Sequence, residues 1–109
     1  MMIPIAQYPF KGPHRSLKDI EDLPGAFAII SEFTGKHYLL DVDCSDEVKK
    51  AIKTHERRKC WENHRKGLLR YAVLYEADFP SKSKEEIVKE VRRKYVTMPC
   101  GGSPRLYEV

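Results

Sequence analysis

The fold is decided by residues 25–55, GAFAIISEFTGKHYLLDVDCSDEVKKAIKTH. Their apolar pattern predicts a strand over 26–31, a tight turn and a second strand over 37–42. An amphipathic helix over 46–59, opened by Ser45, is predicted to follow. Because two strands alone leave one apolar face in water, a helix lying across this hairpin is enough to start a small α/β layer.

The segments on either side extend this unit. Residues 1–22 are predicted to form an N-terminal extension, in which prolines favour extended chain on the surface before a short helix over 17–23. Downstream, LLRYAVLYE at 68–76 predicts a third strand. A capping pattern and an apolar stripe predict a helix over 83–95, and 96–109 is predicted to be an irregular tail.

Length and composition indicate one domain over residues 1–109. A chain of 109 residues is long enough for a single hydrophobic core and too short for two. Its hydrophobic share of 41% is ordinary and its charged share of 33% is high, so disorder is not predicted. We predict an α+β fold in which a small antiparallel three-stranded sheet is flanked by helices.

The cysteines give no clear framework. Cys44, Cys60 and Cys100 form no CxxC pair, which indicates neither a disulfide framework nor a zinc ribbon. Cys60 and His64 have i, i+4 spacing, and His55 and Cys100 are conceivable further zinc ligands. Cysteines that simply pack in the core are the commoner case. We therefore predict that the protein holds no metal.

The amino terminus and the hydropathy bear on the compartment. Residues 1–13 lack the positively charged start and the long apolar run of a signal peptide. No stretch approaches the roughly 20 apolar residues of a membrane span. The sequence predicts a soluble cytoplasmic protein with no membrane partner.

Basic residues concentrate in residues 46–70. This segment holds nine Lys and Arg against four acidic residues, a net charge of +5, whereas the whole chain carries +4. Such a face predicts contacts with nucleic-acid phosphates, with Trp61, Tyr38 or Tyr71 available to stack on bases. A solvated helix face without a ligand is the alternative. The predicted nucleic-acid-binding residues are Lys49, Lys53, Arg57, Arg58, Lys59, Arg65 and Lys66.

Three short sequence motifs, taken in their order along the chain, resemble the GIY-YIG nuclease domain. LPGAFAII at 23–30 is similar to the family's opening strand, and GKHYLL at 35–40 is similar to the approach to its second strand. DEVKKAI at 46–52, with His55 beyond it, resembles the family's basic helix. The resemblance covers about 23–95 and implies a GIY-YIG endonuclease-like fold.

The resemblance also implies that most catalytic groups of the family are replaced here. Phe27 lacks the hydroxyl of the family's first tyrosine, Ala51 replaces its arginine, and Val88 falls at its metal-binding glutamate. Phosphodiester hydrolysis needs a cation on the phosphoryl oxygens and a carboxylate-held metal, so the electrophilic half of the site is missing. Tyr38 and Glu86 are candidate substitutes. The family-equivalent positions are Phe27, Asp41, Asp43, Ala51, His55 and Val88.

We therefore predict a catalytically degenerate nuclease-like domain that binds nucleic acid through its basic helix face, without a cofactor and without the family's cleavage of DNA. One alternative is a protein-interaction module whose cleft, lined by Phe27, Asp41 and Asp43, holds a protein partner or a cationic small ligand. The other is an active endonuclease in which Asp41, Asp43 and Glu86 gather Mg²⁺ or Mn²⁺. His55 has two interpretations, a histidine that transfers protons or contacts phosphate, and a histidine packed at the edge of the core. The sequence indicates no oligomeric state.

Overall fold

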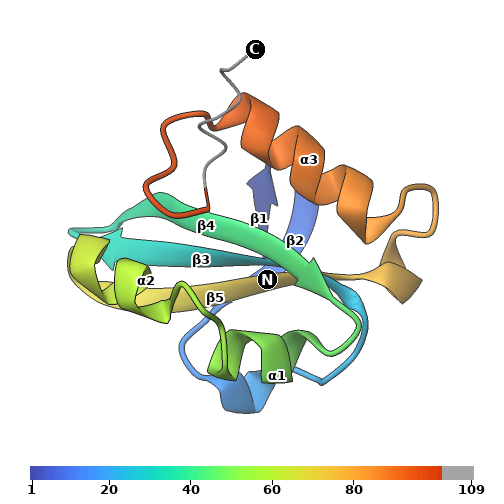
Figure 1. The fold of residues 1–109 in the computed structure, drawn as a ribbon, viewed down its shortest axis with the longest axis horizontal. Helices are drawn as coiled ribbons and strands as arrows, with labels where there is room; N and C mark the ends of the chain where they lie inside the picture. Colours follow the sequence, from blue (N-terminus) through green and yellow to red (C-terminus); the bar gives the residue numbers. More distant parts are fainter. Residues whose placement is uncertain (102–109) are drawn as a thin grey trace.

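The computed structural model describes residues 1–101, and its framework is an antiparallel sheet of five strands that curls into a half-barrel (Figure 1). Across the sheet the strands follow the order β1-β2-β5-β3-β4. The predicted three-stranded sheet flanked by helices, and with it the GIY-YIG endonuclease-like fold, is wrong, because two further strands join from the amino terminus. The strands are β1 (Met2–Ile5), β2 (Tyr8–His14), β3 (Gly25–Phe33), β4 (Lys36–Ser45) and β5 (Leu68–Tyr75).

Strands β1 and β2 stand where a surface extension was predicted. Tyr8, Phe10 and Gly12 are buried and alternate with more exposed residues, and this period of two lets β2 pair with β5. The alternation outweighs the prolines of this segment, which are tolerated near the edge of a sheet. The predicted helix over 17–23 is only a 3₁₀ turn, η1 (Leu17–Asp19).

The predicted hairpin is confirmed as β3 and β4. Thr34 and Gly35 between them have φ angles of 50° and 78°, the conformation that two-residue hairpin turns adopt to match the twist of their strands. Strand β3 lies between β4 and β5, and its first seven residues are buried. In the register of the hairpin, Phe27 lies opposite Asp43.

The predicted helix over 46–59 is two helices, α1 (Val48–Lys53) and α2 (Arg58–His64). Ile52 and Trp61 are nine residues apart in the sequence. Nine residues make about two and a half turns of an α-helix, so a continuous helix would point these side chains in opposite directions. Both are buried in the same hydrophobic cluster, and the break between α1 and α2 makes this burial possible.

The third helix, α3 (Lys84–Lys94), agrees with its prediction. The hydroxyl oxygen of Ser83 caps it by accepting a hydrogen bond from the Glu86 N–H at 3.1 Å. The apolar stripe faces the sheet as the sequence pattern predicts. Its buried residues are Ile87, Val88 and Val91.

The remaining chain is irregular. A 3₁₀ turn, η2 (Glu76–Asp78), follows β5. Of the predicted tail over 96–109, residues 96–101 form turns and bends, and the rest lies outside the described residues. Within residues 1–101, no helix has the length and the apolar composition that crossing a membrane requires.

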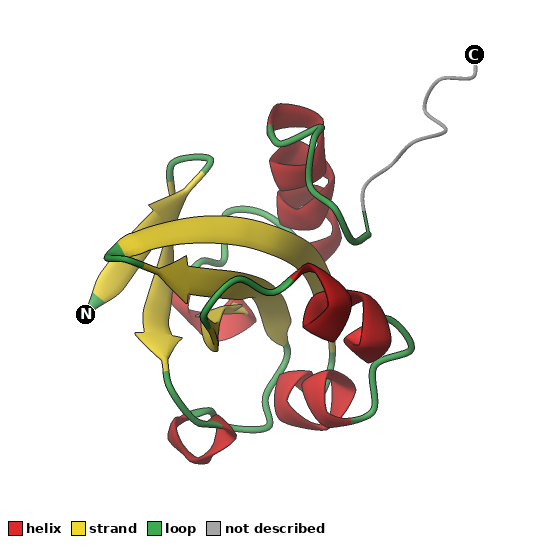
Figure 2. Ribbon diagram, turned by 90° about the vertical axis from the view of Figure 1, so that its left-hand side faces the viewer, coloured by secondary structure: helices red, strands yellow, loops and turns green. Residues whose placement is uncertain are grey.

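Helices cover both faces of the sheet (Figures 1 and 2). On one face, here called the α3 face, α3 packs on a cluster that includes Phe10, Ala28 and Val42. On the other, the α1–α2 face, α1, α2 and η1 pack around Phe27 and Trp61. The sheet therefore separates two hydrophobic clusters, each closed by its own helices.

Candidate functional site

Among residues 1–101, Asp41 in β4 is the one charged side chain with none of its surface exposed. Its carboxylate accepts hydrogen bonds from Trp61 Nε1 at 2.6 Å and from the Val42 N–H at 2.7 Å. Arg57 donates to it from Nε at 2.9 Å and from Nη2 at 3.1 Å. Four donors satisfy the acceptor capacity of a carboxylate, and the bidentate guanidinium balances its charge. The buried charge is therefore fully paired, as burial requires.

A second carboxylate, that of Asp43, continues this network towards the surface. Its Oδ2 lies 2.9 Å from His55 Nε2 and 3.2 Å from Arg57 Nη2, and its Oδ1 accepts from the Cys44 N–H at 2.9 Å. The Arg57 N–H donates to His55 Nδ1 at 3.1 Å, which places the ring proton on Nε2. Both ring nitrogens are engaged, so His55 is a structural member of the network. We call Asp41, Asp43, His55, Arg57 and Trp61 the aspartate network.

The aspartate network favours the charged forms of its members. Burial, the largest single influence on Asp43, raises its pKa, but the hydrogen bonds from His55 and the Cys44 N–H and the charge of Arg57 outweigh burial and lower that pKa. Burial likewise opposes the charge of Arg57, and its hydrogen bond and charge interaction with Asp41 leave its pKa raised. The ion pairs therefore persist at neutral pH.

The same carboxylates cap the open edge of the sheet. Strand β4 is an edge strand, so its outward backbone groups have no partner strand. The N–H groups of Val42 and Cys44 donate instead to the side chains of the preceding residues, Asp41 and Asp43. These aspartates occupy the donors through which another strand would pair.

Other segments cap the carbonyls of this edge. The Leu40 carbonyl accepts from the Cys100 N–H at 2.8 Å, and the Val42 carbonyl accepts from Arg92 Nη2 at 3.0 Å. The next residue, Gly101, has a φ of 65°, and a Cβ there would lie 2.0 Å from an oxygen of Asp41. Only glycine fits this close approach. Residues 98–101 thus lie over the edge of the sheet and the buried carboxylate.

The structure brings some family-equivalent positions together and separates others. Phe27 is buried beside His55, with ring centroids 5.8 Å apart, on the side of the two network aspartates. Ala51 is half-buried against the same hydrophobic cluster. Val88 lies across the sheet, in the cluster of the α3 face. The catalytic arrangement that the resemblance implies is therefore not assembled.

The candidate substitutes lie away from the aspartate network. Tyr38 is 44% exposed near the hairpin turn, and Glu86 is exposed in the first turn of α3. The carboxylates of Asp41 and Asp43 are already occupied by N–H donors and by Arg57. The structure does not bring Asp41, Asp43 and Glu86 together as a metal site.

The break between α1 and α2 divides the predicted basic stripe. Arg57 turns inward to the two aspartates of the network, and its side chain is 26% exposed. Arg65 pairs with Glu62 at 3.4 Å. Arg58 donates from Nη1 to a carbonyl of α1 at 2.9 Å. The predicted residues that have no carboxylate of residues 1–101 within 4.0 Å, here called the basic surface, are Lys49, Lys53, Arg58, Lys59 and Lys66.

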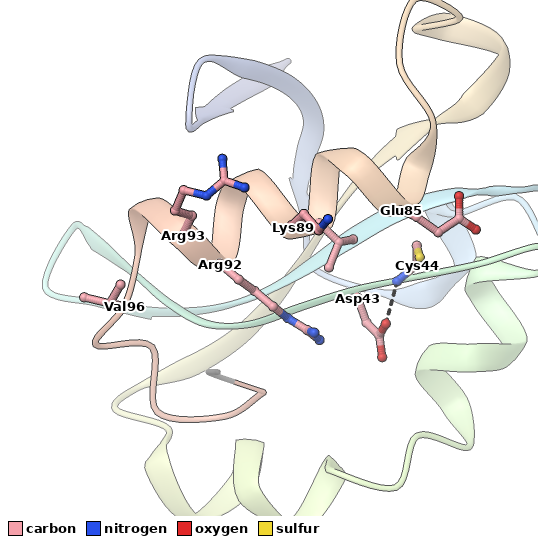
Figure 3. A pocket seen from close by; sticks show the side chains of 8 residues that line it. Asp43, Cys44, Glu85, Lys89, Arg92, Arg93 and Val96 are labelled. Carbon is pink, nitrogen blue, oxygen red and sulfur yellow. Dashed lines mark hydrogen bonds between the residues drawn. The ribbon is translucent and has the colours of Figure 1, made fainter. Parts of the chain in front are cut away.

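A groove of about 550 Å³ runs between α3 and the end of β4 (Figure 3). Asp43 and Arg92 face it, and Arg92 Nε is buried without a hydrogen-bond partner among residues 1–101. Burial, with the charges of Asp43 and Glu85, raises the pKa of the Cys44 thiol in the groove to about 11. This thiol is therefore protonated at neutral pH. The other walls come from Glu85, Val88, Lys89, Arg93 and Val96.

Cys60 in α2 and Cys100 after α3 are joined by a disulfide, which the sequence did not predict. His64 Nδ1 lies 3.5 Å from Cys60 Sγ and 3.9 Å from Cys100 Sγ. Within residues 1–101, these three residues form the group of His, Cys, Asp or Glu side chains that could hold a metal ion. His55, the other conceivable zinc ligand, is bound to Asp43 instead.

Sequence reasoning missed the inward role of Arg57 and its partner Asp41. They are separated by 16 residues, so no local spacing relates them. One signal was available, because Asp41 lies between Leu40 and Val42 in a predicted buried strand, and a buried carboxylate requires a cation. The disulfide gave no comparable signal, since its cysteines are 40 residues apart and the total number of cysteines is odd.

Comparison of the chain with protein-family models, with curated proteins and with solved structures finds no match. None of these comparisons identifies a GIY-YIG domain. The resemblance in the sequence stays a prediction, and the five-stranded sheet is not the fold that it implies. What the protein does is therefore proposed from the placement of its own side chains.

Proposed function

We propose that this protein binds the phosphate backbone of nucleic acid through the basic surface on α1, α2 and the loop after α2. The observation that carries the proposal is the set of five basic side chains, between Lys49 and Lys66, that no carboxylate of residues 1–101 approaches within 4.0 Å. All five come from one continuous segment on one face of the sheet. A phosphate that contacts one of these five side chains therefore displaces no ion pair among residues 1–101.

The basic residues of this segment fall into two groups, those that pair with carboxylates and those that do not, and this difference supports the proposal. Four other basic residues of the segment, Lys50, Arg57, Arg65 and Arg70, pair with carboxylates of the protein itself. Arg57 therefore has a structural role, which revises the predicted set of contact residues. The five side chains of the basic surface can contact phosphates and release the counterions condensed on the nucleic acid. Binding should therefore weaken steeply as the salt concentration rises.

The aromatic residues set the expected selectivity. Trp61 is 1% exposed and Tyr71 is half-buried, so neither is free to stack on a base. Tyr38 in β4 is exposed, and it lies opposite Ser31, which is hydrogen-bonded to the backbone of Lys66, so it is the one aromatic ring of the three available beside the basic surface. Recognition through phosphates alone discriminates poorly between sequences. We therefore propose binding with little base preference. We also propose, from the sequence, that the protein works in a reducing cytoplasm.

The test uses fluorescence anisotropy with labelled single-stranded and double-stranded DNA and RNA of mixed sequence at low salt. Replacing Lys53, Lys59 and Lys66 by glutamate should weaken binding by at least about tenfold. The matched control replaces three exposed basic residues of α3 by glutamate, which changes the net charge equally and should preserve most of the affinity. The control residues are Lys89, Arg93 and Lys94.

Two results would overturn the proposal. One is the absence of binding by the wild-type protein to all four nucleic acids at low salt. The other is an equal loss of affinity in both variants, which would show that total charge, and not the basic surface, determines binding. Circular dichroism of each variant establishes that its fold is intact.

A second candidate function is supported by the groove between α3 and β4. The predicted interaction cleft lined by Phe27, Asp41 and Asp43 does not exist as such, because the first two side chains have no exposed surface. The groove instead joins apolar walls to the unpartnered Nε of Arg92 and the ammonium of Lys89. This combination fits a peptide that carries both carboxylates and apolar side chains.

This second candidate is tested by nuclear magnetic resonance titration with a short peptide of alternating glutamate and leucine. Amide shifts should concentrate at residues 85–96 and 43–44, and Arg92→Gln should reduce them. Shifts spread over the whole protein, or shifts unchanged in Arg92→Gln, contradict a binding site in the groove.

A further inference from the structure

The carboxyl-terminal end of α2 brings three metal-ligating side chains together. Cys60 and His64 lie one turn apart on α2, and Cys100 arrives from the chain after α3. Their ligand atoms all lie within 4.8 Å of one another. None of the three belongs to the basic surface or to the aspartate network, so this cluster has no role in the proposed function.

Two of the three distances between the ligand atoms match those of a tetrahedral zinc site. Zinc binds thiolate sulfur at about 2.3 Å and imidazole nitrogen at about 2.0–2.1 Å, which places sulfur and nitrogen ligands about 3.6 Å apart in a tetrahedron. The two sulfur-to-nitrogen distances are 3.5 Å from Cys60 and 3.9 Å from Cys100. Only the two sulfurs, joined as a disulfide, are closer than a metal would hold them.

We propose that the reduced protein binds one Zn²⁺ through Cys60, His64 and Cys100, and that the disulfide is the metal-free, oxidised form of the same site. A dithiol reductant supplies two electrons and two protons to the disulfide and becomes a disulfide itself. Zn²⁺ then binds the two sulfurs as thiolates, with release of both thiol protons, and the neutral imidazole of His64 as third ligand.

The burial of the ligands fits this arrangement. Cys100 is 1% exposed, Cys60 is half-buried and His64 is exposed, so the site is closed on one side and open to water on the other. Water completes the tetrahedron from the open side. His64 Nδ1 lies 3.1 Å from the Cys60 carbonyl in the oxidised form. Metal binding moves its proton to the solvent-facing Nε2.

Both forms of the site tie residues 98–101 to α2. In the oxidised form the tie is the disulfide, and in the reduced form it is the metal. The Cys100 N–H caps the Leu40 carbonyl at 2.8 Å, and Gly101 lies against Asp41. The cover over the edge of β4 is thus kept under oxidising and under reducing conditions.

The test is a titration of the full chain with Co²⁺ under anaerobic conditions, after reduction and removal of the reductant. The reduced wild-type protein should take up one Co²⁺, with a thiolate-to-cobalt charge-transfer band and the intense visible bands of tetrahedral coordination. Added Zn²⁺ should displace the Co²⁺ and remove these bands. The oxidised protein should show neither binding nor bands.

Variants identify the ligands. Cys60→Ser and Cys100→Ser should each weaken or abolish the charge-transfer band, and His64→Ala should lower Co²⁺ affinity by at least about tenfold. Cys44→Ser is the matched control, because Cys44 lies in the groove beside α3, and it should bind as the wild type does.

A measurement on the wild-type protein avoids reliance on the folding of any variant. Zn²⁺ should protect Cys60 and Cys100 of the reduced protein from alkylation, as read by mass spectrometry of peptides, and leave the slow modification of Cys44 unchanged. Three results would overturn the proposal in favour of a disulfide with no metal-bound form: absence of a charge-transfer band in the reduced protein, a band of full wild-type intensity in Cys60→Ser, or equal alkylation with and without Zn²⁺.

Discussion

The two faces of the sheet are covered in different ways. On the α3 face, Ile87, Val88 and Val91 pack on the strands. Around this packing, Arg92 donates to the Val42 carbonyl, and Glu90 pairs with Lys82. On the α1–α2 face, apolar packing is joined by the aspartate network and by the covalent link between Cys60 and Cys100. Both faces therefore have polar contacts, but among residues 1–101 the charged side chain with no exposed surface, Asp41, lies on the α1–α2 face beside Trp61.

The difference follows from the helices themselves. Helix α3 has eleven residues and a side-chain cap, whereas α1 has six, α2 has seven, and neither has a capping side chain. Isolated helices of this length gain too little from their own hydrogen bonds to be stable. Inward side chains of the α1–α2 region therefore hold these helices in place, whereas Lys49, Lys53 and Lys59 pair with no carboxylate of residues 1–101.

The largest expected effect comes from the centre of the aspartate network. Asp41→Asn removes the charge that pairs with Arg57 but keeps the shape of the side chain. Because a buried ion pair that loses one partner leaves the other uncompensated, the free energy of unfolding should fall by about 3–5 kcal/mol. Urea denaturation measures this change.

The control for this variant is Asp46→Asn, which also breaks an ion pair, with Lys84 at 3.1 Å, but removes a carboxylate that is 83% exposed. The free energy of unfolding of this control should change by less than about 1 kcal/mol. If Asp41→Asn were as mild as Asp46→Asn, the network would contribute nothing to the α1–α2 face.

The second largest loss of stability is expected when the disulfide between Cys60 and Cys100 is removed. The disulfide spans 40 residues of sequence. Closing a loop of this length restricts the unfolded chain, so Cys100→Ser should lower the free energy of unfolding by about 3–4 kcal/mol relative to the oxidised protein. The comparison is made by urea denaturation with a metal chelator present. Equal stability of the oxidised protein and this variant would show that the link does not hold the α1–α2 face.

On the α3 face, the expected effect is that of apolar packing alone. Val91→Ala deletes two methyl groups from a side chain with none of its surface exposed. At about 0.8 kcal/mol for each buried carbon, with a further cost for the cavity, the loss should be about 2 kcal/mol. It should be independent of pH between pH 4 and pH 8, roughly, since the substitution removes no charge. A loss that varied with pH would show that the substitution also disturbs the charged contacts of α3.

A smaller effect is expected from Asp43 in acid. Its pKa is lowered in the folded protein, so its contribution to stability is present above the unfolded pKa of about 3.9 and is lost as the pH falls through the lower folded pKa. Asp43→Asn should therefore flatten the fall in stability below a pH of about 4. Urea midpoints at a series of acidic pH values measure the slope. A variant that loses stability as steeply as the wild type contradicts this role.

The sequence predicted the elements whose signals are local. The hairpin followed from its turn at Thr34 and Gly35, and α3 followed from its cap at Ser83 and its apolar stripe. Strands β1 and β2 were missed because their prolines concealed the alternation of Tyr8 and Phe10.

The site was harder to predict than the fold because its contacts are not local. Counting charges along a continuous helix placed Arg57 with the lysines, whereas the break before α2 turns it towards Asp41. The position of Trp61, half a turn out of phase with Ile52, is the one sequence signal for that break. The pairing of Cys60 with Cys100 depends on the position of the chain after α3 in the folded protein. The spacing of residues in the sequence does not predict that position.

The most direct test of the account is the salt dependence of nucleic-acid binding, measured for the wild type and for Lys53, Lys59 and Lys66 replaced together by alanine. If the basic surface binds phosphates, log Kobs should fall linearly with log salt concentration, and the triple variant should reduce the slope by about 3, one for each lost phosphate contact. Alanine at Lys89, Arg93 and Lys94 should leave the slope near that of the wild type. An unchanged slope in the first variant, or an equal reduction in both, would contradict the claim that the outward lysines of the α1–α2 face form the binding surface.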